Sequence, residues 1–206
     1  MAIKEKAWYP IVFMFIATLF FSAILIAFGS FTRQRVQDNE RIAFERAVLE
    51  ALPIDLPLKA SPPAIHTMYL EYIKDSTDAS AGALRYMKND SLIAYALPLE
   101  GPGFWAQIRG VIGIAADKKT ITGISFYEQN ETPGLGGEIV KQDFRNQFIG
   151  KLLADKDIPL EIRMQSVLLD ESSVHAVTGA TQTSTRLGRF MNDQLMQWLH
   201  AMKETN

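Results

Sequence analysis

The sequence predicts an α+β protein, in which an N-terminal transmembrane helix precedes a domain of mixed sheet and helix. Three observations predict it. No charged residue occurs between Ala7 and Thr32, short apolar segments of strand length recur between residues 67 and 168, and a helical pattern ends the chain. The strands and helices do not follow a regular strand–helix–strand rhythm, which favours α+β over α/β.

The first predicted element is the transmembrane helix. Trp8 to Gly29 is almost wholly apolar and exceeds the roughly 20 residues that cross a hydrocarbon core. Trp8 and Tyr9 lie where aromatic residues gather at a membrane interface. Because Lys4 and Lys6 precede the segment, a cleaved signal peptide is the alternative. Charge does not fix the orientation, since these lysines oppose the arginines between residues 33 and 46.

The chain is predicted to divide into three parts. Residues 1–32 form the anchor, residues 33–63 a juxtamembrane helix and linker, and residues 64–206 the folded domain. Gln34 to Leu52 has the apolar spacing of an amphipathic helix. The prolines between residues 53 and 63 then interrupt that helix and form the linker.

The predicted domain is rich in strands. Segments with the alternation or apolar runs of strands are Thr67–Ile73, Ser91–Leu97, Gly110–Ala115, Ile121–Tyr127 and Ile162–Leu168. Polar turns are predicted at Lys88–Asp90 and Ala116–Lys119. Segments in which apolar residues recur every three or four positions, as in helices, are Gln142–Leu153 and Thr183–Met202.

Composition excludes several classes of function. The formal net charge is −2, so no basic surface predicts nucleic-acid binding. The chain has no cysteine, which excludes thiolate-bound zinc, iron–sulfur clusters and disulfides. The 3 histidines lack ligand spacing, so no metal site is predicted. No hydrolytic triad, P-loop or Rossmann glycine pattern is present, so the chain is predicted to have no catalytic residues and not to be a catalyst by itself.

The most informative motif is Val177-Thr178-Gly179-Ala180-Thr181, which lies where the last helix begins. The first N–H groups of a helix have no partner within it, and the positive end of the dipole attracts an anion. Gly179 lacks the Cβ that would block a phosphate, and Thr181 offers a hydroxyl. A threonine-rich helix cap is the alternative interpretation.

A second motif, Glu131-Thr132-Pro133-Gly134-Leu135-Gly136-Gly137, follows a predicted strand. Its proline and glycines predict a loop with exposed backbone N–H groups, which can bind the edge of a ring system while Leu135 covers a face. Phe104 and Trp105 follow a glycine-rich turn and can stack near such a ring or pack in the core. Arg186 and Arg189 follow the first motif and can pair with a phosphate or face solvent.

Together these motifs resemble the covalent-FMN subunits of the Rnf and NQR respiratory complexes, the RnfG/NqrC family, in which ETPGLG and a later (S/T)GAT are the signatures. Similarity extends to Gly103–Trp105, to Gly110–Tyr127 and to the hydrophobic N-terminal segment, so it covers most of the chain. Ile121–Glu128 leading into the second motif resembles NqrC, whereas the short chain is closer to RnfG.

The resemblance implies that FMN is attached through its phosphate to Thr181, and that a separate flavin transferase installs it from FAD. Glu131 and Thr132 are expected to tune the flavin. The full predicted FMN site is Thr181, Thr178, Gly179, Ala180, Thr183, Glu131, Thr132, Gly134, Leu135, Gly136, Phe104 and Trp105. One departure is His175, since the transferase's pattern usually has an aspartate three residues before the first threonine.

The same resemblance implies a single-pass protein of the bacterial inner membrane with its domain on the extracytoplasmic side. It would be an electron-transfer subunit of an Rnf- or NQR-type NADH:quinone or ferredoxin:NAD oxidoreductase coupled to Na⁺ or H⁺ transport. Its partners would be the other membrane subunits, the flavin transferase and the lipid bilayer. The alternatives are a flavin-free structural assembly subunit and a stand-alone FMN-domain protein serving another quinone or extracellular reductase.

Overall fold

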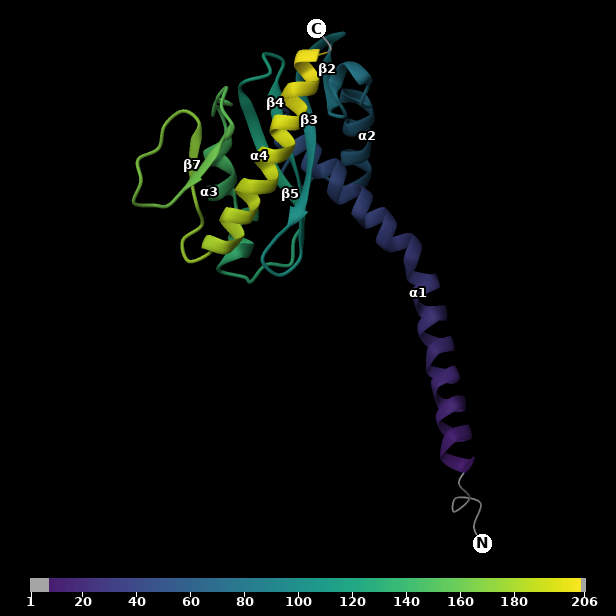
Figure 1. Cartoon of the computed structure of the whole chain (residues 1–206). Helices are drawn as coiled ribbons and strands as arrows, with labels where there is room; N and C mark the ends of the chain where they lie inside the picture. The colour runs from purple at the N-terminus through teal and green to yellow at the C-terminus, as the bar shows by residue number, and fades with distance from the viewer. Residues whose placement is uncertain (1–7, 205–206) are drawn as a thin grey trace. The chain divides into compact units, whose positions relative to one another are not determined.

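The computed structural model describes residues 8–204. The chain divides into a first compact unit that ends at Arg41 and a second that begins at Ile42. Helix α1 (Trp8–Ala51) continues through both (Figure 1). The predicted helix over Gln34–Leu52 is therefore confirmed as helical, although it continues the preceding segment instead of being separate. The predicted boundaries at residues 32 and 63 stay predictions; residues 42–63 cluster with the second unit.

The first unit is the exposed, apolar part of α1. Among the described residues, α1 is the one helix long and apolar enough to cross a membrane, judged by length and composition. A signal sequence near the N-terminus meets the same criteria. The predicted flanking residues Lys4 and Lys6 lie outside the described residues.

The second unit contains a five-stranded antiparallel sheet in which each strand pairs with the next along the chain (Figure 1). The strands are β1 (Ile73–Lys74), β2 (Leu84–Lys88), β3 (Ser91–Pro102), β4 (Gln107–Ala115) and β5 (Ile121–Glu128). The strands predicted over residues 91–97, 110–115 and 121–127 are confirmed within β3, β4 and β5. Positive φ angles at Asn89 (51°) and Asp90 (59°) form the predicted tight turn between β2 and β3.

The strand predicted over Thr67–Ile73 is wrong except at its last residue. This segment belongs to helix α2 (Pro62–Tyr72), and β1 begins at Ile73. Pro62 and Pro63 occupy the first turn of α2, where a missing N–H costs no hydrogen bond. The apolar residues that pack on the sheet recur at helical spacing, at Ile65, Met68, Tyr69 and Tyr72.

Two further predicted elements are shorter than expected. The strand predicted over Ile162–Leu168 is limited to β6 (Glu161–Arg163), which pairs in parallel with β7 (Ser173–His175). The helix predicted over Gln142–Leu153 is α3 (Gln142–Arg145) followed by the 3₁₀ turn η4 (Asn146–Phe148), and Gly150 at φ +78° follows. The remaining 3₁₀ turns are η2 (Asp78–Ser80) and η3 (Gly136–Val140).

Helices cover both faces of the sheet. Helix α4 (Thr181–Glu204) contains the predicted helix over Thr183–Met202 and lies across one face, while the end of α1 and α2 pack on the other (Figure 1). Side chains alternate along β3, so that Tyr95, Leu97 and Leu99 join the α4 side and Ala94 and Ala96 the α1 side. The α+β class is confirmed.

The end of α1 rests on a glycine pair in the sheet. Gly113 of β4 lies opposite Gly123 of β5, and a Cβ built on Gly113 would lie 2.0 Å from the carbonyl oxygen of Ala51. The Thr122 hydroxyl donates a hydrogen bond of 2.8 Å to that oxygen. The missing side chain therefore lets the last turn of α1 contact the sheet directly.

Replacing Gly113 with alanine should displace the end of α1, because the clash is with backbone. We expect the free energy of unfolding to fall by about 3 kcal/mol, measured by urea denaturation of the full chain in detergent. Gly188→Ala is the matched control. Its added Cβ meets Ile162 side-chain atoms at 3.6 Å or more, and a helical alanine should stabilise α4 by about 0.5–1 kcal/mol. Equal stability of the two variants would contradict this packing.

Candidate functional site

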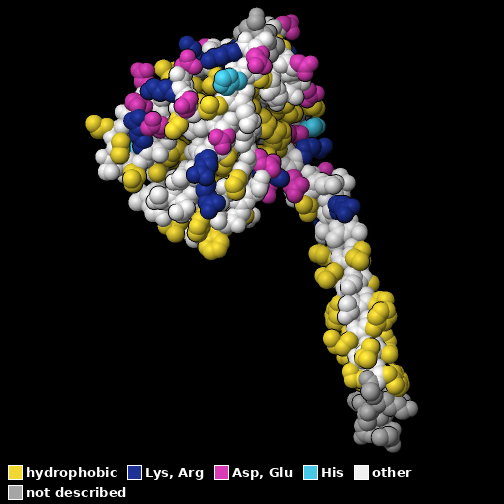
Figure 2. Space-filling model, in the orientation of Figure 1, with side chains coloured by type: hydrophobic (Ala, Val, Ile, Leu, Met, Phe, Trp, Pro, Cys, Tyr) yellow, Lys and Arg dark blue, Asp and Glu magenta, His cyan; other side chains and the backbone are white. Residues whose placement is uncertain are grey.

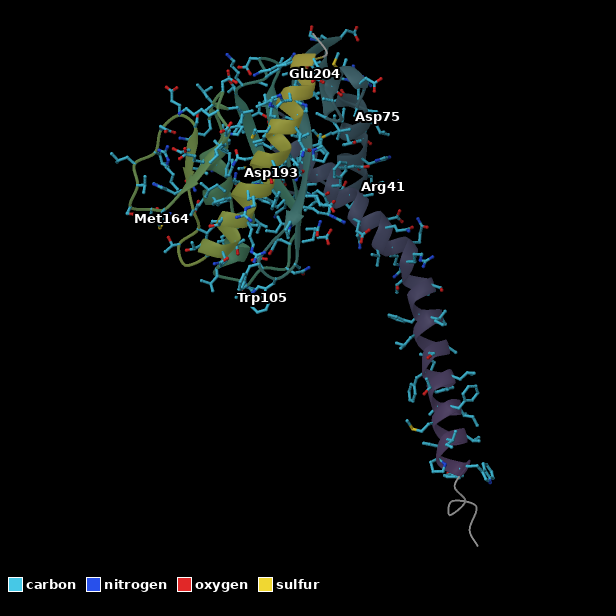
Figure 3. All side chains as sticks on the ribbon, in the orientation of Figure 1. Arg41, Asp75, Trp105, Met164, Asp193 and Glu204 are labelled. Atoms are coloured by element: carbon cyan, nitrogen blue, oxygen red, sulfur yellow. The ribbon has the colours of Figure 1, made fainter. Side chains whose placement is uncertain are left out.

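A pocket of ≈ 340 Å³ lies at the N-terminal end of α4. Three segments enclose it: the turn between β3 and β4, the loop after β5, and the segment that begins α4. The lining residues are Phe104, Trp105, Glu131, Thr132, Leu135, Gly136, Gly179, Ala180, Thr181, Gln182 and Thr183. Figure 3 shows Trp105 at this end of the domain. The two sequence motifs and the aromatic pair thus meet at one site.

A buried carboxylate joins the three segments. Glu131 is 5% exposed and accepts a hydrogen bond of 2.5 Å at Oε2 from the Thr183 hydroxyl. Its Oε1 accepts the backbone N–H of Trp105 at 2.9 Å. The N–H of Glu131 itself donates to Oε1 of Gln129 at 2.7 Å. Glu131 therefore fixes the start of α4 and the aromatic turn relative to its own loop.

Two glycines of the motifs make room for this carboxylate. A Cβ on Gly103 would lie 2.5 Å from Oε1 of Glu131, and a Cβ on Gly136 would lie 2.4 Å from Oγ1 of Thr183. Both distances are well below van der Waals contact. These glycines are therefore explained by packing around Glu131, without reference to a ligand.

The loop after β5 uses most of its backbone N–H groups internally. Leu135 and Gly137 donate to the carbonyl of Thr132 at 3.1 and 3.0 Å, and Gly134, at φ +75°, donates to Oε1 of Glu138 at 3.1 Å. The predicted row of exposed donors is therefore reduced. Within this loop, as described, the N–H groups of Thr132 and Gly136 have no protein acceptor.

The segment that begins α4 presents free donors and a free hydroxyl. Gly179 takes φ +76°, and the N–H of Ala180 bonds to the carbonyl of Val177 at 3.1 Å, which turns the chain into α4 at Thr181. Thr181 is exposed. In the described chain, no protein group accepts from the N–H groups of residues 181–183. This is the arrangement in which a helix N-terminus binds an anion.

All predicted site residues line this pocket except Thr178 and Gly134. Those two line an adjacent hollow of ≈ 320 Å³ together with polar side chains of α3 and η3. Gln182 lines the pocket but was not among the predicted residues; its place beside Thr181 in the first turn could have indicated it. His175 lies on β7 and does not line the pocket; its Nε2 is 3.1 Å from the carbonyl of Val167.

The pocket fits a ligand with a flat apolar ring and an anionic group. Phe104, Trp105 and Leu135 offer partly exposed apolar side chains, and the free N–H donors and the Thr181 hydroxyl supply the polar groups. A mostly apolar cavity with few polar groups is the usual form of a cofactor site. Residues 8–204 contain no group of three or more His, Asp or Glu side chains that could hold a metal ion.

Replacing Thr183 with valine tests the link to α4. Valine keeps the shape of threonine but removes the hydroxyl, so Oε2 of Glu131 would stay buried without its partner. We expect a loss of about 1–3 kcal/mol in the free energy of unfolding, measured by urea denaturation. Thr185→Val is the control, because Thr185 lies exposed on the same helix. Equal stabilities of these two variants would show that the hydrogen bond contributes nothing.

Comparison with known proteins identifies the ligand class. A family model described as FMN-binding domain matches residues 103–195, which includes all three pocket segments. Residues 103–195 form an FMN-binding domain of the NqrC/RnfG type. The predicted family is confirmed, and so is the prediction that the ligand is FMN.

Curated relatives match the same region. The FMN-binding domain is similar to the NqrC protein of the Na⁺-translocating NADH-quinone reductase of Vibrio vulnificus, with 37% identity over 110 residues, which cover 52% of this chain and 43% of that one. The corresponding protein of Yersinia pestis is 40% identical over 99 residues, which cover 47% of this chain and 37% of that one. The matched region therefore spans less than half the length of these relatives.

Two solved structures share the fold. NqrC from Parabacteroides distasonis superposes with a TM-score of 0.71 and 22% identity, covering 84% of this chain and 98% of that one. NqrC from Shewanella oneidensis gives a TM-score of 0.67 and 20% identity, covering 82% and 99%. At these identities the superpositions support the architecture of the FMN-binding domain alone.

Proposed function

We propose that this chain is a membrane-anchored electron-transfer subunit that carries FMN covalently on Thr181. The observation that supports it most strongly is the juxtaposition of an exposed threonine hydroxyl, free helix N–H groups and apolar ring-sized walls in one pocket. Bound FMN would supply reversible electron acceptance, which no side chain of this cysteine-free chain supplies.

Each wall of the pocket has a part in holding FMN. Thr181 carries the phosphate in a phosphoester, and the N–H groups of Gln182 and Thr183 neutralise its charge. Leu135 and the aromatic pair Phe104 and Trp105 cover the ring and exclude water. The free N–H groups of the loop after β5 are available to the polar edge of the ring. Thr178 and Gly134 keep their predicted roles as neighbours of the site.

The attachment reaction requires another protein. A phosphoester forms between Oγ1 of Thr181 and the FMN phosphate, the P–O–P bond of FAD breaks, and AMP leaves. The hydroxyl needs a base to remove its proton. Glu131 lines the same pocket, but its oxygens accept hydrogen bonds from Thr183 and Trp105. We therefore propose that a flavin transferase supplies the activating group, and that it accepts His175 in place of the usual aspartate.

The names of the relatives support a place in an NQR-type complex, with an Rnf-type complex as the other candidate. In either, the chain would pass electrons between partner subunits of an oxidoreductase coupled to Na⁺ or H⁺ transport. The apolar segment of α1 would anchor it in the bacterial inner membrane with the domain on the extracytoplasmic side.

Purification of the tagged full chain from its native membranes in mild detergent tests this function. We expect covalent flavin on the chain together with the other membrane subunits of one oxidoreductase. A flavin-free chain that copurifies with such subunits would instead identify a structural assembly subunit. A flavin-bearing chain that copurifies with none would identify a stand-alone FMN-domain protein.

A further inference from the structure

Two arginines of α4 differ from the others in the second unit. Those at positions 46, 85, 109, 145 and 163 each make a side-chain hydrogen bond or an ion pair. Within residues 42–204, Arg186 and Arg189 make neither, and both are exposed. Arg189 and Asp193 are four residues apart, a spacing at which ion pairs form on helices, yet no such pair is present between them. The two guanidinium groups are therefore available to a partner.

These arginines lie on the face of α4 that leads away from the pocket. Gln182, Arg186 and Arg189 are spaced by four and three residues, so they share one side of the helix, and Gln182 lines the pocket. The Arg186 guanidinium lies 5.9 Å from the centroid of the Phe104 ring, which also lines the pocket. Figure 2 shows Lys and Arg side chains grouped over the lower half of α4, above hydrophobic side chains at that end of the domain.

Apolar side chains are exposed beside this basic face. Phe104, Trp105 and Leu135 are 47%, 68% and 45% exposed. Exposed aromatic residues next to arginine are typical of the energetically important centres of protein interfaces. The docking face formed by these three residues with Arg186 and Arg189 therefore has an apolar centre and a basic rim.

We propose that this docking face binds a partner protein whose contact surface places carboxylates around an apolar centre. A guanidinium matches a carboxylate in two parallel hydrogen bonds. A lipid surface fits less well, because recognition of anionic lipids uses clusters of about 4–8 basic residues. The surface depends on the proposed function, since a redox partner must approach the mouth of the FMN pocket.

Site-specific photocrosslinking in native membranes tests the docking face. The full chain carries a benzophenone amino acid in place of Thr185, which lies exposed beside Arg186. A second version carries it in place of Lys88, in the exposed turn between β2 and β3. Covalent flavin is measured on every sample, so a failure of the proposed FMN site is seen separately. The crosslinked segment is identified by mass spectrometry.

We expect residue 185, but not residue 88, to crosslink to one protein segment that contains Asp or Glu. The double substitution R186E/R189E should reduce the yield about tenfold while flavin is retained, and changing the captured carboxylates to lysine should restore it. An unchanged yield in the double variant, an adduct with lipid, or no adduct on flavin-bearing chain would overturn the proposal. Loss of flavin in the double variant would instead assign the arginines to the FMN phosphate and would also overturn it.

Discussion

Thr181→Ala should leave the chain without covalent flavin when it is produced together with a flavin transferase. The substitution removes the one atom, Oγ1, that the proposed phosphoester requires. It should leave the fold intact, because Thr181 is exposed and loss of a hydroxyl in the first turn of a helix costs at most about 1 kcal/mol. Flavin fluorescence of the chain after denaturing electrophoresis measures the attachment.

Thr185→Ala provides the control for Thr181. It removes an exposed hydroxyl from the next turn of α4 and should retain full flavin fluorescence. Fluorescence that persists in Thr181→Ala would place the attachment at another residue. Equal loss in both variants would show that the transferase is sensitive to the helix as a whole.

Glu131→Gln should raise the reduction potential of the bound flavin. Glutamine can still accept the N–H of Trp105 and can donate to Oγ1 of Thr183, so the pocket keeps its links while a buried negative charge is removed. A negative charge nearby disfavours the addition of electrons. We therefore expect a rise of roughly 30–60 mV, equivalent to about 1.4–2.8 kcal/mol for a two-electron couple. Spectroelectrochemical titration of the purified holoprotein measures this shift.

The matched control is Glu138→Gln. Glu138 accepts from Gly134 and pairs with Lys141 at 2.6 Å, and it does not line the pocket. Its substitution should change the potential by far less. Equal changes in both variants, or no change in Glu131→Gln, would mean that the charge of Glu131 does not act on the flavin.

The sequence predicted the site well because its motifs carry their own geometry. Gly179 and Thr181 mark the start of α4 through helix chemistry that depends on local sequence. The contact between Glu131 and Thr183 could not be predicted, since they are 52 residues apart and meet only when the sheet and α4 pack together. The glutamate was expected to tune the flavin, and its buried hydrogen bonds add the positioning of three segments to that prediction.

The fold was predicted where one face of an element is buried against a single neighbour. Along β3 the alternation of large and small apolar residues is clear in the sequence, whereas in α2 the short segment after Pro63 fits both a strand and a helix. Packing on the sheet decides for the helix, because Ile65 becomes fully buried there. The loop after β6 was also misassigned: its apolar residues, such as Leu168 at 90% exposure, are not in a core.

The intact mass of the denatured full chain, from cells that contain a flavin transferase, tests the central claim most directly. Denaturation removes any flavin that is held without a covalent bond. The proposed site predicts the mass of the chain plus FMN less one water, with the added mass on the peptide that contains Thr181. An unmodified mass would contradict covalent attachment and would favour the flavin-free structural subunit.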